Sequence, residues 1–143
     1  MAMQKIGSAR WQGGIKDGGG TISTQSGVLK DAPYGFKARF EGGPGTNPEE
    51  LIGAAHAGCF SMALSLILGE AGMVPDSIDT KATVTLEKDG GGFSITAIHL
   101  DVAVRIPGAD QAAFDKCAQT AKENCPVSKL MKAPITMNAT LNA

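Results

Sequence analysis

Two cysteines in different local settings offer the best chemistry in this chain. Cys59 lies in a long apolar segment that is expected to be helical. Cys125 is followed directly by Pro126, so it is expected to sit at the start of a helix. Unpaired backbone N–H groups at a helix start lower the pKa of a thiol. Two such separated thiols suit a reaction in which one attacks a substrate and the other resolves the product.

Each cysteine also has a purely structural interpretation. Free cysteine is among the most buried residue types, so Cys59 is also compatible with a core position. Gly53 and Gly58 favour function, because a glycine inside a helix costs about 1 kcal/mol relative to Ala and suggests close approach of another group. Cys125 is compatible with a simple cap. Cys117 falls on an apolar stripe and is predicted to pack in the core.

Histidines and glycines add little chemistry. His56 precedes Cys59 by one helical turn and is a candidate base, although a buried, hydrogen-bonded histidine is the simpler interpretation. His56 and His99 lack the paired spacing of a zinc site. The glycines at 18–20 are not followed by the Lys of a phosphate-binding loop. We therefore predict no metal and no cofactor.

The composition bounds the class of protein. A length of 143 residues predicts one domain over residues 1–143. The net charge of -1 argues against binding to nucleic acid or to an anionic membrane. Three cysteines cannot form a closed disulfide framework within one chain. The first ten residues lack the apolar stretch of a signal peptide, and the apolar run 60–68 is shorter than a membrane span, so a cytoplasmic location is expected.

The periodic segments predict an α+β fold with helices segregated on curved antiparallel sheets. Strands are predicted over residues 5–11, 21–26, 34–40, 81–88, 93–106 and 135–141. A change of parity within 93–106 predicts either a bulge near Ala97 or a strong twist. A long helix should start at Pro48, with Asn47 as its cap and Glu50 completing a capping-box pattern, and should run to about Glu70. Residues 110–124 should form an amphipathic helix, and a short helix should follow Cys125.

The long helix is apolar on almost every side, which is typical of a helix buried all round. A chain of this size cannot readily surround such a helix alone. Burial against a partner chain is a natural solution.

Three motifs together resemble the OsmC (osmotically inducible protein C) family over essentially the whole chain. They are TNPEELIGAAHAGCFSMA at residues 46–63, YGFKARFEG at 34–42 and NCPVS at 124–128. The place of Arg39 ahead of the Asn-Pro-Glu segment is similar to the OsmC branch rather than to the sister organic hydroperoxide resistance branch.

The resemblance implies a function and a set of roles. Members of the family are thiol-dependent peroxidases that prefer organic hydroperoxides, act in oxidative and osmotic stress defence, and form intertwined homodimers around a long buried central helix. By this resemblance Cys59 is the peroxidatic cysteine, Cys125 is the resolving cysteine, and Arg39 and Glu49 are the charged partners. An intramolecular disulfide forms, and an external dithiol reduces it.

Simple estimates refine the roles of the charged pair. Lowering a thiol pKa from ~8.5 to ~6 increases its reactivity only a few-fold, because nucleophilicity falls as the thiolate fraction rises. Arg39 is therefore expected to orient the peroxide and to stabilise the departing oxygen. A continuous helix separates Glu49 from Cys59 by about 15 Å along its axis. We therefore expect Arg39 and Glu49 to serve the Cys59 of a partner chain.

Two other classes of function stay open. One is a module that binds apolar small molecules without redox turnover, and the other is a structural dimer whose thiols are incidental. Loss of an organic hydroperoxide in the presence of a dithiol would separate both from a peroxidase.

Overall fold

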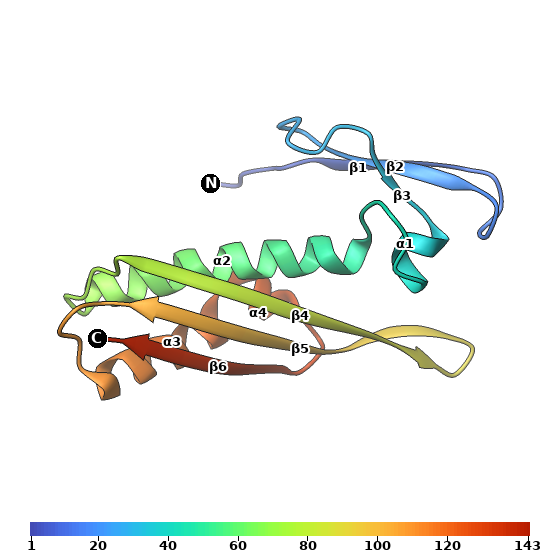
Figure 1. Ribbon diagram of the computed structural model, residues 1–143. Coiled ribbons are helices and arrows are strands. Elements are labelled where there is room, and N and C mark those ends of the chain that lie inside the picture. The colour runs from blue at the N-terminus through green and yellow to red at the C-terminus, as the bar shows by residue number, and fades with distance from the viewer. The chain divides into compact units, whose positions relative to one another are not determined.

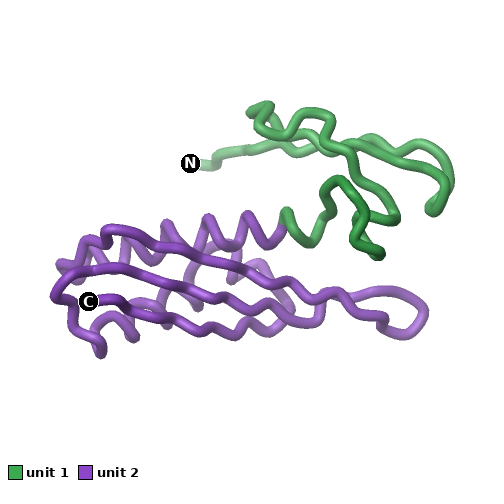
Figure 2. The backbone as a smooth tube through the Cα atoms, in the orientation of Figure 1, with its two compact units in different colours: residues 1–51 green, residues 52–143 purple.

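The computed structural model describes residues 1–143. The chain divides into two compact units, Met1–Leu51 and Ile52–Ala143, which Figure 2 shows in green and purple. Helices and strands are segregated along the chain, and the predicted α+β class is confirmed. The single domain predicted over residues 1–143 stays a prediction.

The first unit is built on a small antiparallel sheet. Its strands are β1 (Gly7–Gln12), β2 (Gly19–Thr24) and β3 (Ala32–Tyr34), in the order β1-β2-β3. The glycine-rich loop joins β1 and β2 into a hairpin, as predicted. β2 begins two residues earlier than the predicted 21–26, because Gly19 and Gly20 still pair with Gln12 and Trp11.

The strand predicted over residues 34–40 is wrong beyond Tyr34. Phe36–Phe40 form a short helix, α1, in which the Arg39 N–H donates to the Gly35 carbonyl at 3.1 Å. The ring centroids of Phe36 and Phe40 lie 5.0 Å apart. Residues four apart meet in this way on a helix, whereas a strand would hold them about 13 Å apart. Ring packing along α1 therefore replaces the expected strand, and it places Arg39 on a helix.

Helix α2 (Pro48–Glu70) begins and ends where the sequence predicts. The Oδ1 atom of Asn47 accepts a hydrogen bond from the Glu50 N–H at 2.8 Å, so Asn47 caps the first turn. The Glu50 carboxylate accepts from the Thr46 hydroxyl at 2.8 Å and ties the helix start to the preceding loop. At the other end Gly72 has φ +80°, a left-handed conformation that favours glycine and stops the helix.

The sheet of the second unit consists of three longer strands. They are β4 (Ser77–Asp89), β5 (Gly92–Arg105) and β6 (Ile135–Asn142), which lie side by side in Figure 1. β4 begins four residues before the predicted 81–88, because Ser77 already pairs with Arg105. Thr85 pairs with Ala97 and Leu86 pairs with Ile95, which leaves Thr96 as an extra residue on β5. The predicted bulge is confirmed.

The expectation of antiparallel sheets fails at one pair of strands. β4 and β5 are antiparallel, but β5 and β6 are parallel. The chain between them forms α3 (Gln111–Asn124) and α4 (Pro126–Leu130). Parallel neighbours require a long crossover of this kind, so the sheet is mixed.

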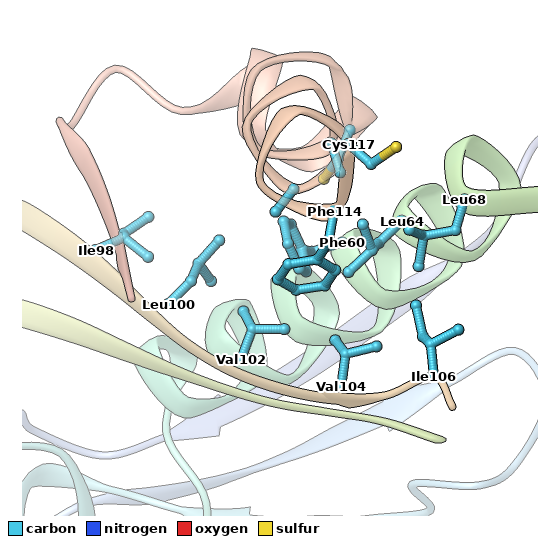
Figure 3. Close-up of a cluster of buried hydrophobic side chains, with 13 residues drawn as sticks. Phe60, Leu64, Leu68, Ile98, Leu100, Val102, Val104, Ile106, Phe114 and Cys117 are labelled. Atoms are coloured by element: carbon cyan, nitrogen blue, oxygen red, sulfur yellow. The ribbon is translucent and has the colours of Figure 1, made fainter. Parts of the chain in front are cut away.

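The hydrophobic core of the second unit lies between the sheet and the helices. Phe60, Leu64 and Leu68 of α2 meet Phe114 of α3 over the apolar face of β5, as Figure 3 shows. The β5 side chains that close this core alternate along the strand: Ile98, Leu100, Val102 and Val104. The predicted stripe of α3, which consists of Phe114, Cys117, Ala118 and Ala121, is buried here.

Helix α2 is not buried on all sides within one chain. Its core-facing residues Phe60, Leu64 and Leu68 have no exposed surface, but Met62 is 77% exposed and Leu66 is 65% exposed. By length and composition α2 could cross a membrane. Its packing against β5 and α3 instead identifies α2 as the core helix of this unit.

Candidate active site

Cys125 connects two helices and is fully buried. Its N–H donates to the Ala121 carbonyl at 3.0 Å at the end of α3. Its sulfur accepts a hydrogen bond from the Ser128 N–H at 3.4 Å and so caps α4, in which Pro126 is the first residue. The predicted place of Cys125 at a helix start is confirmed.

Cys59 lies on α2 next to Cys125. Both cysteines are free, and each lies near enough to the other to shift its pKa. Cys59 is half-buried and packs against the core cluster, whereas Cys125 belongs to that cluster. The fold therefore brings together two thiols that are far apart in the sequence, and it leaves only Cys59 open to solvent.

The surroundings shift the pKa values of the two thiols in opposite directions. Burial raises the pKa of Cys59, the Val127 N–H opposes this rise, and the neighbouring Cys125 adds to it. Burial by itself would raise the pKa of Cys125 as well. Hydrogen bonds from the Ser128 side chain and N–H, from Cys59 and from the Val127 N–H outweigh it and lower the pKa of Cys125. In the reduced pair the thiolate form is therefore more favourable at Cys125 than at Cys59.

A buried histidine lies one turn before Cys59. His56 has no exposed surface, and its Nε2 atom lies 2.8 Å from the Ser128 hydroxyl oxygen. Burial lowers the pKa of His56, so the ring is neutral near pH 7. The structure confirms that His56 is buried and hydrogen-bonded through Nε2, whereas its Nδ1 atom has no hydrogen-bond partner.

Arg39 and Glu49 form an ion pair within the first unit. The guanidinium donates two hydrogen bonds to the carboxylate, from Nε to Oε1 and from Nη2 to Oε2, both at 3.0 Å. Glu49 is only 8% exposed, while the Arg39 side chain is 38% exposed. This fork geometry holds the guanidinium in one orientation and leaves part of it free for another ligand.

An aromatic cavity of about 270 Å³ adjoins Arg39 in the first unit. The rings of Trp11 and Tyr34 meet edge to face with centroids 5.5 Å apart, and Arg39 lies over the Phe40 ring. The cavity is lined by Trp11, Ile15, Tyr34, Gly35, Phe36, Arg39 and Phe40. It offers an apolar surface beside a fixed positive charge.

The predicted site residues therefore form two pairs, Cys59 with Cys125 and Arg39 with Glu49. Cys117 lies in the core, as predicted. Sequence reasoning missed Ser128, which hydrogen-bonds to His56 through its hydroxyl and to Cys125 through its backbone N–H. Its position three residues after the capping Cys125 is the signal that could have found it, because a cap and the third helical residue contact each other.

Gly53 and Gly58 of α2 were expected to allow another group to approach the helix closely. A side chain at Gly53 would meet the Ala82 carbonyl oxygen at 3.2 Å, so this glycine does allow β4 to approach the helix. A side chain at Gly58 would meet nothing within 4 Å. The expected close approach is confirmed at Gly53 and does not occur at Gly58 within one chain.

No group of three or more His, Cys, Asp or Glu side chains could hold a metal ion.

Comparison with known proteins identifies the family of this chain. Residues 41–140 match the family described as OsmC-like protein. Peroxiredoxin OsmC of Escherichia coli (strain K12) is 59% identical over 143 residues, which cover 100% of both chains. The organic hydroperoxide resistance protein OhrB of Bacillus subtilis (strain 168) is 30% identical over 123 residues, or 85% of this chain and 88% of OhrB.

The fold comparison points the same way. The crystal structure of OhrB of Bacillus subtilis covers 96% of this chain and 98% of its own, with a TM-score of 0.67 and 29% identity. A family match over most of the chain, a relative identical at more than half of all positions, and a shared fold lead to one conclusion. The chain belongs to the OsmC-like protein family.

Proposed function

We propose that this chain is a cysteine-based peroxidase that reduces organic hydroperoxides to alcohols in oxidative and osmotic stress defence. The observation that carries the proposal is the proximity of two free thiols, Cys59 and Cys125, of which one is reachable from solvent and the other is buried. The names of the relatives support it, since one is a peroxiredoxin and the other confers organic hydroperoxide resistance.

The reaction has three steps. The Cys59 thiolate attacks the peroxide oxygen that bears hydrogen, the O–O bond breaks, and the alkoxide takes a proton and leaves as the alcohol. Cys59 is then a sulfenic acid, which Cys125 attacks to form a disulfide with loss of water. An external dithiol reduces this disulfide by thiol exchange. The half-buried position of Cys59 supports its role as the attacking thiol, because peroxide must reach it.

Arg39 and Glu49 supply what the thiol pair lacks. The groups that shift the pKa of Cys59 include no cation, and together they disfavour its thiolate. A guanidinium fixed by Glu49 can bind the peroxide and stabilise charge on the departing oxygen. It would also draw negative charge from Cys125 toward Cys59.

We propose further that the site is composite and that the protein is an obligate homodimer. α2 is continuous, and Glu49 and Cys59 are ten residues apart on it, a rise of about 15 Å. Two α2 helices packed about a two-fold axis would bring Arg39 and Glu49 of one subunit to Cys59 of the other. The exposed Met62 and Leu66 support this, since a partner would cover them.

The aromatic cavity beside Arg39 supports an organic substrate. An apolar tail that buries about 60 Å² in such a cavity gains about 1.5 kcal/mol, or roughly tenfold in kcat/KM over hydrogen peroxide. The substrate class is thus an organic hydroperoxide with an apolar tail. A higher kcat/KM for hydrogen peroxide than for cumene hydroperoxide would contradict this assignment.

Two cysteine variants test the roles directly. Cys59→Ser should abolish peroxide loss with a dithiol present, while Cys125→Ser should accumulate a sulfenic acid on Cys59 that a dimedone-type reagent traps. Cys117→Ser is the matched control, because it changes a third thiol of the same unit. Trapping the sulfenic acid on Cys125 would reverse the roles. No peroxide loss in the unchanged protein would favour an apolar binding module or a structural dimer.

Mixed dimers test the composite site. Cys59→Ser and Arg39→Ala chains are each expected to be inactive alone. A heterodimer of the two should regain one working site, which subunit exchange followed by a turnover assay would detect. No recovery despite proven exchange would show that each chain builds its own site.

The cytoplasm, which keeps thiols reduced, is the proposed location.

A further inference from the structure

His56 and Ser128 form a buried pair behind the thiols that the reaction steps above do not use. His56 has no exposed surface and Ser128 is 7% exposed. Their side chains come from α2 and α4, and Nε2 of His56 lies 2.8 Å from Oγ of Ser128. A short polar contact in an apolar core costs desolvation free energy, so its presence beside Cys125 calls for a reason.

The surroundings assign the direction of this hydrogen bond. Nδ1 of His56 is buried and has no hydrogen-bond partner. A buried N–H without an acceptor is rarer in proteins than an under-used acceptor, so Nδ1 is assigned as the bare nitrogen and Nε2 as the one that carries hydrogen. His56 therefore donates to the hydroxyl oxygen of Ser128.

The direction of the His56 hydrogen bond also determines where the Ser128 hydroxyl hydrogen can point. Because its oxygen already accepts from His56, its own hydrogen is free to point toward Cys125. The Ser128 backbone N–H donates to the Cys125 sulfur at 3.4 Å, and the hydroxyl of the same residue lies near enough to help lower the pKa of that thiol. The result is one chain of donors, from His56 through Ser128 to Cys125.

We propose that His56 and Ser128 are positioning residues for the resolving step, in which His56 orients the Ser128 hydroxyl and that hydroxyl holds the Cys125 sulfur as a thiolate aimed at Cys59. This inference rests on the proposed function, because it takes Cys125 as the resolving thiol. The groups that face Cys125 are Cys59, Ser128 and the Val127 N–H, and His56 acts through Ser128.

The step balances as follows. A lone pair of the Cys125 thiolate forms the S–S bond with the sulfur of the Cys59 sulfenic acid. The S–O bond breaks, its electron pair leaves with hydroxide, and hydroxide takes one proton and departs as water. As the Cys125 sulfur loses its charge, the Ser128 hydrogen bond weakens. The donor chain thus supports the reactant thiolate and its direction, and it transfers no atom.

Removing the Ser128 hydroxyl should change the pKa of Cys125 by a measurable amount. Hydrogen bonds to charged groups contribute enough that removing one should raise the pKa of Cys125 by about one to two units. A less acidic thiol is also a better nucleophile once ionised, so the rate of disulfide formation should fall by only about three- to tenfold from this effect. Loss of orientation would add to the decrease.

Rapid mixing with cumene hydroperoxide separates the two steps. Sulfenic acid formation is second order and scales with peroxide, whereas disulfide formation is first order and does not. Ser128→Ala and His56→Leu should each slow the first-order phase at least threefold and should not slow the second-order phase, because a less acidic Cys125 competes less with Cys59 for the negative charge. Ser128→Thr and His56→Gln keep a hydroxyl and a side-chain N–H donor and should restore the first-order rate. Ser61→Ala, which removes a partly buried α2 serine bonded to Ala57 and Thr80, is the matched control.

A second measurement does not depend on turnover. In a Cys59→Ser, Cys117→Ala background Cys125 is the single thiol, and its ultraviolet thiolate absorbance against pH reports its pKa. Adding Ser128→Ala should raise this pKa by about one unit or more, and adding His56→Leu should raise it less. An unchanged pKa together with an unchanged first-order rate would overturn the inference. Failure of Cys125→Ser to accumulate sulfenic acid would instead overturn the proposed function. The pKa measurement would still show whether Ser128 and His56 stabilise the Cys125 thiolate.

Discussion

His56 is expected to make the protein sensitive to mild acid. Burial lowers the pKa of His56 below the ordinary value of 6.5 that it regains in the unfolded chain. As the pH falls through 6.5, the unfolded state binds a proton that the folded state does not. The free energy of unfolding therefore falls with decreasing pH, and the contribution of neutral His56 is fully present only above 6.5.

The size of this effect follows from proton linkage. In the limit in which folded His56 stays neutral, protonation of the unfolded state lowers the free energy of unfolding by about 0.2 kcal/mol at pH 7 and by about 1.4 kcal/mol at pH 5.5. The difference of about 1.2 kcal/mol is the largest that one histidine can give over this interval. His56→Leu removes the titrating group and fills a similar volume, so this part of the pH dependence should disappear.

Urea unfolding at pH 7 and pH 5.5 would measure the effect. Protein concentration must be held constant, because the stability of the proposed dimer would depend on it. The unchanged protein should lose up to about 1.2 kcal/mol more than His56→Leu between the two pH values. The His99→Leu variant, which removes a half-exposed histidine from the sheet, should retain the loss assigned to His56. An equal loss in the unchanged protein and in His56→Leu would refute the reasoning, since it would mean that folded His56 already carries the proton.

Three further changes have expected outcomes. Cys117→Ala should leave peroxidase turnover near that of the unchanged protein and cost about 1 kcal/mol of stability through a small cavity, and a large loss of turnover with folding intact would contradict its core role. Gly58→Ala should stabilise α2 by up to about 1 kcal/mol in thermal unfolding, whereas Gly53→Ala should gain less because of the Ala82 carbonyl oxygen at 3.2 Å. Destabilisation by Gly58→Ala would show that a partner packs on that face. Asn47→Ala should cost about 1 kcal/mol through loss of the α2 cap, which denaturant titration would detect.

Local signals in the sequence predicted much of the fold. Asn47 and Pro48 predicted the start of α2, because a cap and a first-turn proline act within one helical turn. The change of parity near Ala97 predicted the β5 bulge, since alternation reports which face of a strand is buried. The stripe on α3 predicted its buried face for the same kind of reason.

Two predictions failed, one because of a local contact and one because of the path of the chain. The segment after Tyr34 alternates like a strand, but the packing of Phe36 on Phe40 makes it a helix. Strand β6 was expected in an antiparallel sheet, yet its direction depends on the path of the chain through α3 and α4. The first outcome depends on a contact between residues four apart, and only the second depends on tertiary structure.

The sequence by itself determined the kind of chemistry that this protein can perform. It supplied a thiol on an apolar helix, Cys59, a second thiol at a helix start, Cys125, and a charged pair in a recognisable family pattern. Only the tertiary structure decided that these two thiols are neighbours and that Ser128 and His56 lie beside Cys125. It also decided which thiol better carries negative charge. The physical reason is that desolvation and hydrogen bonding at a sulfur depend on neighbours from α2 and α4, whose separation in the sequence hides their contact.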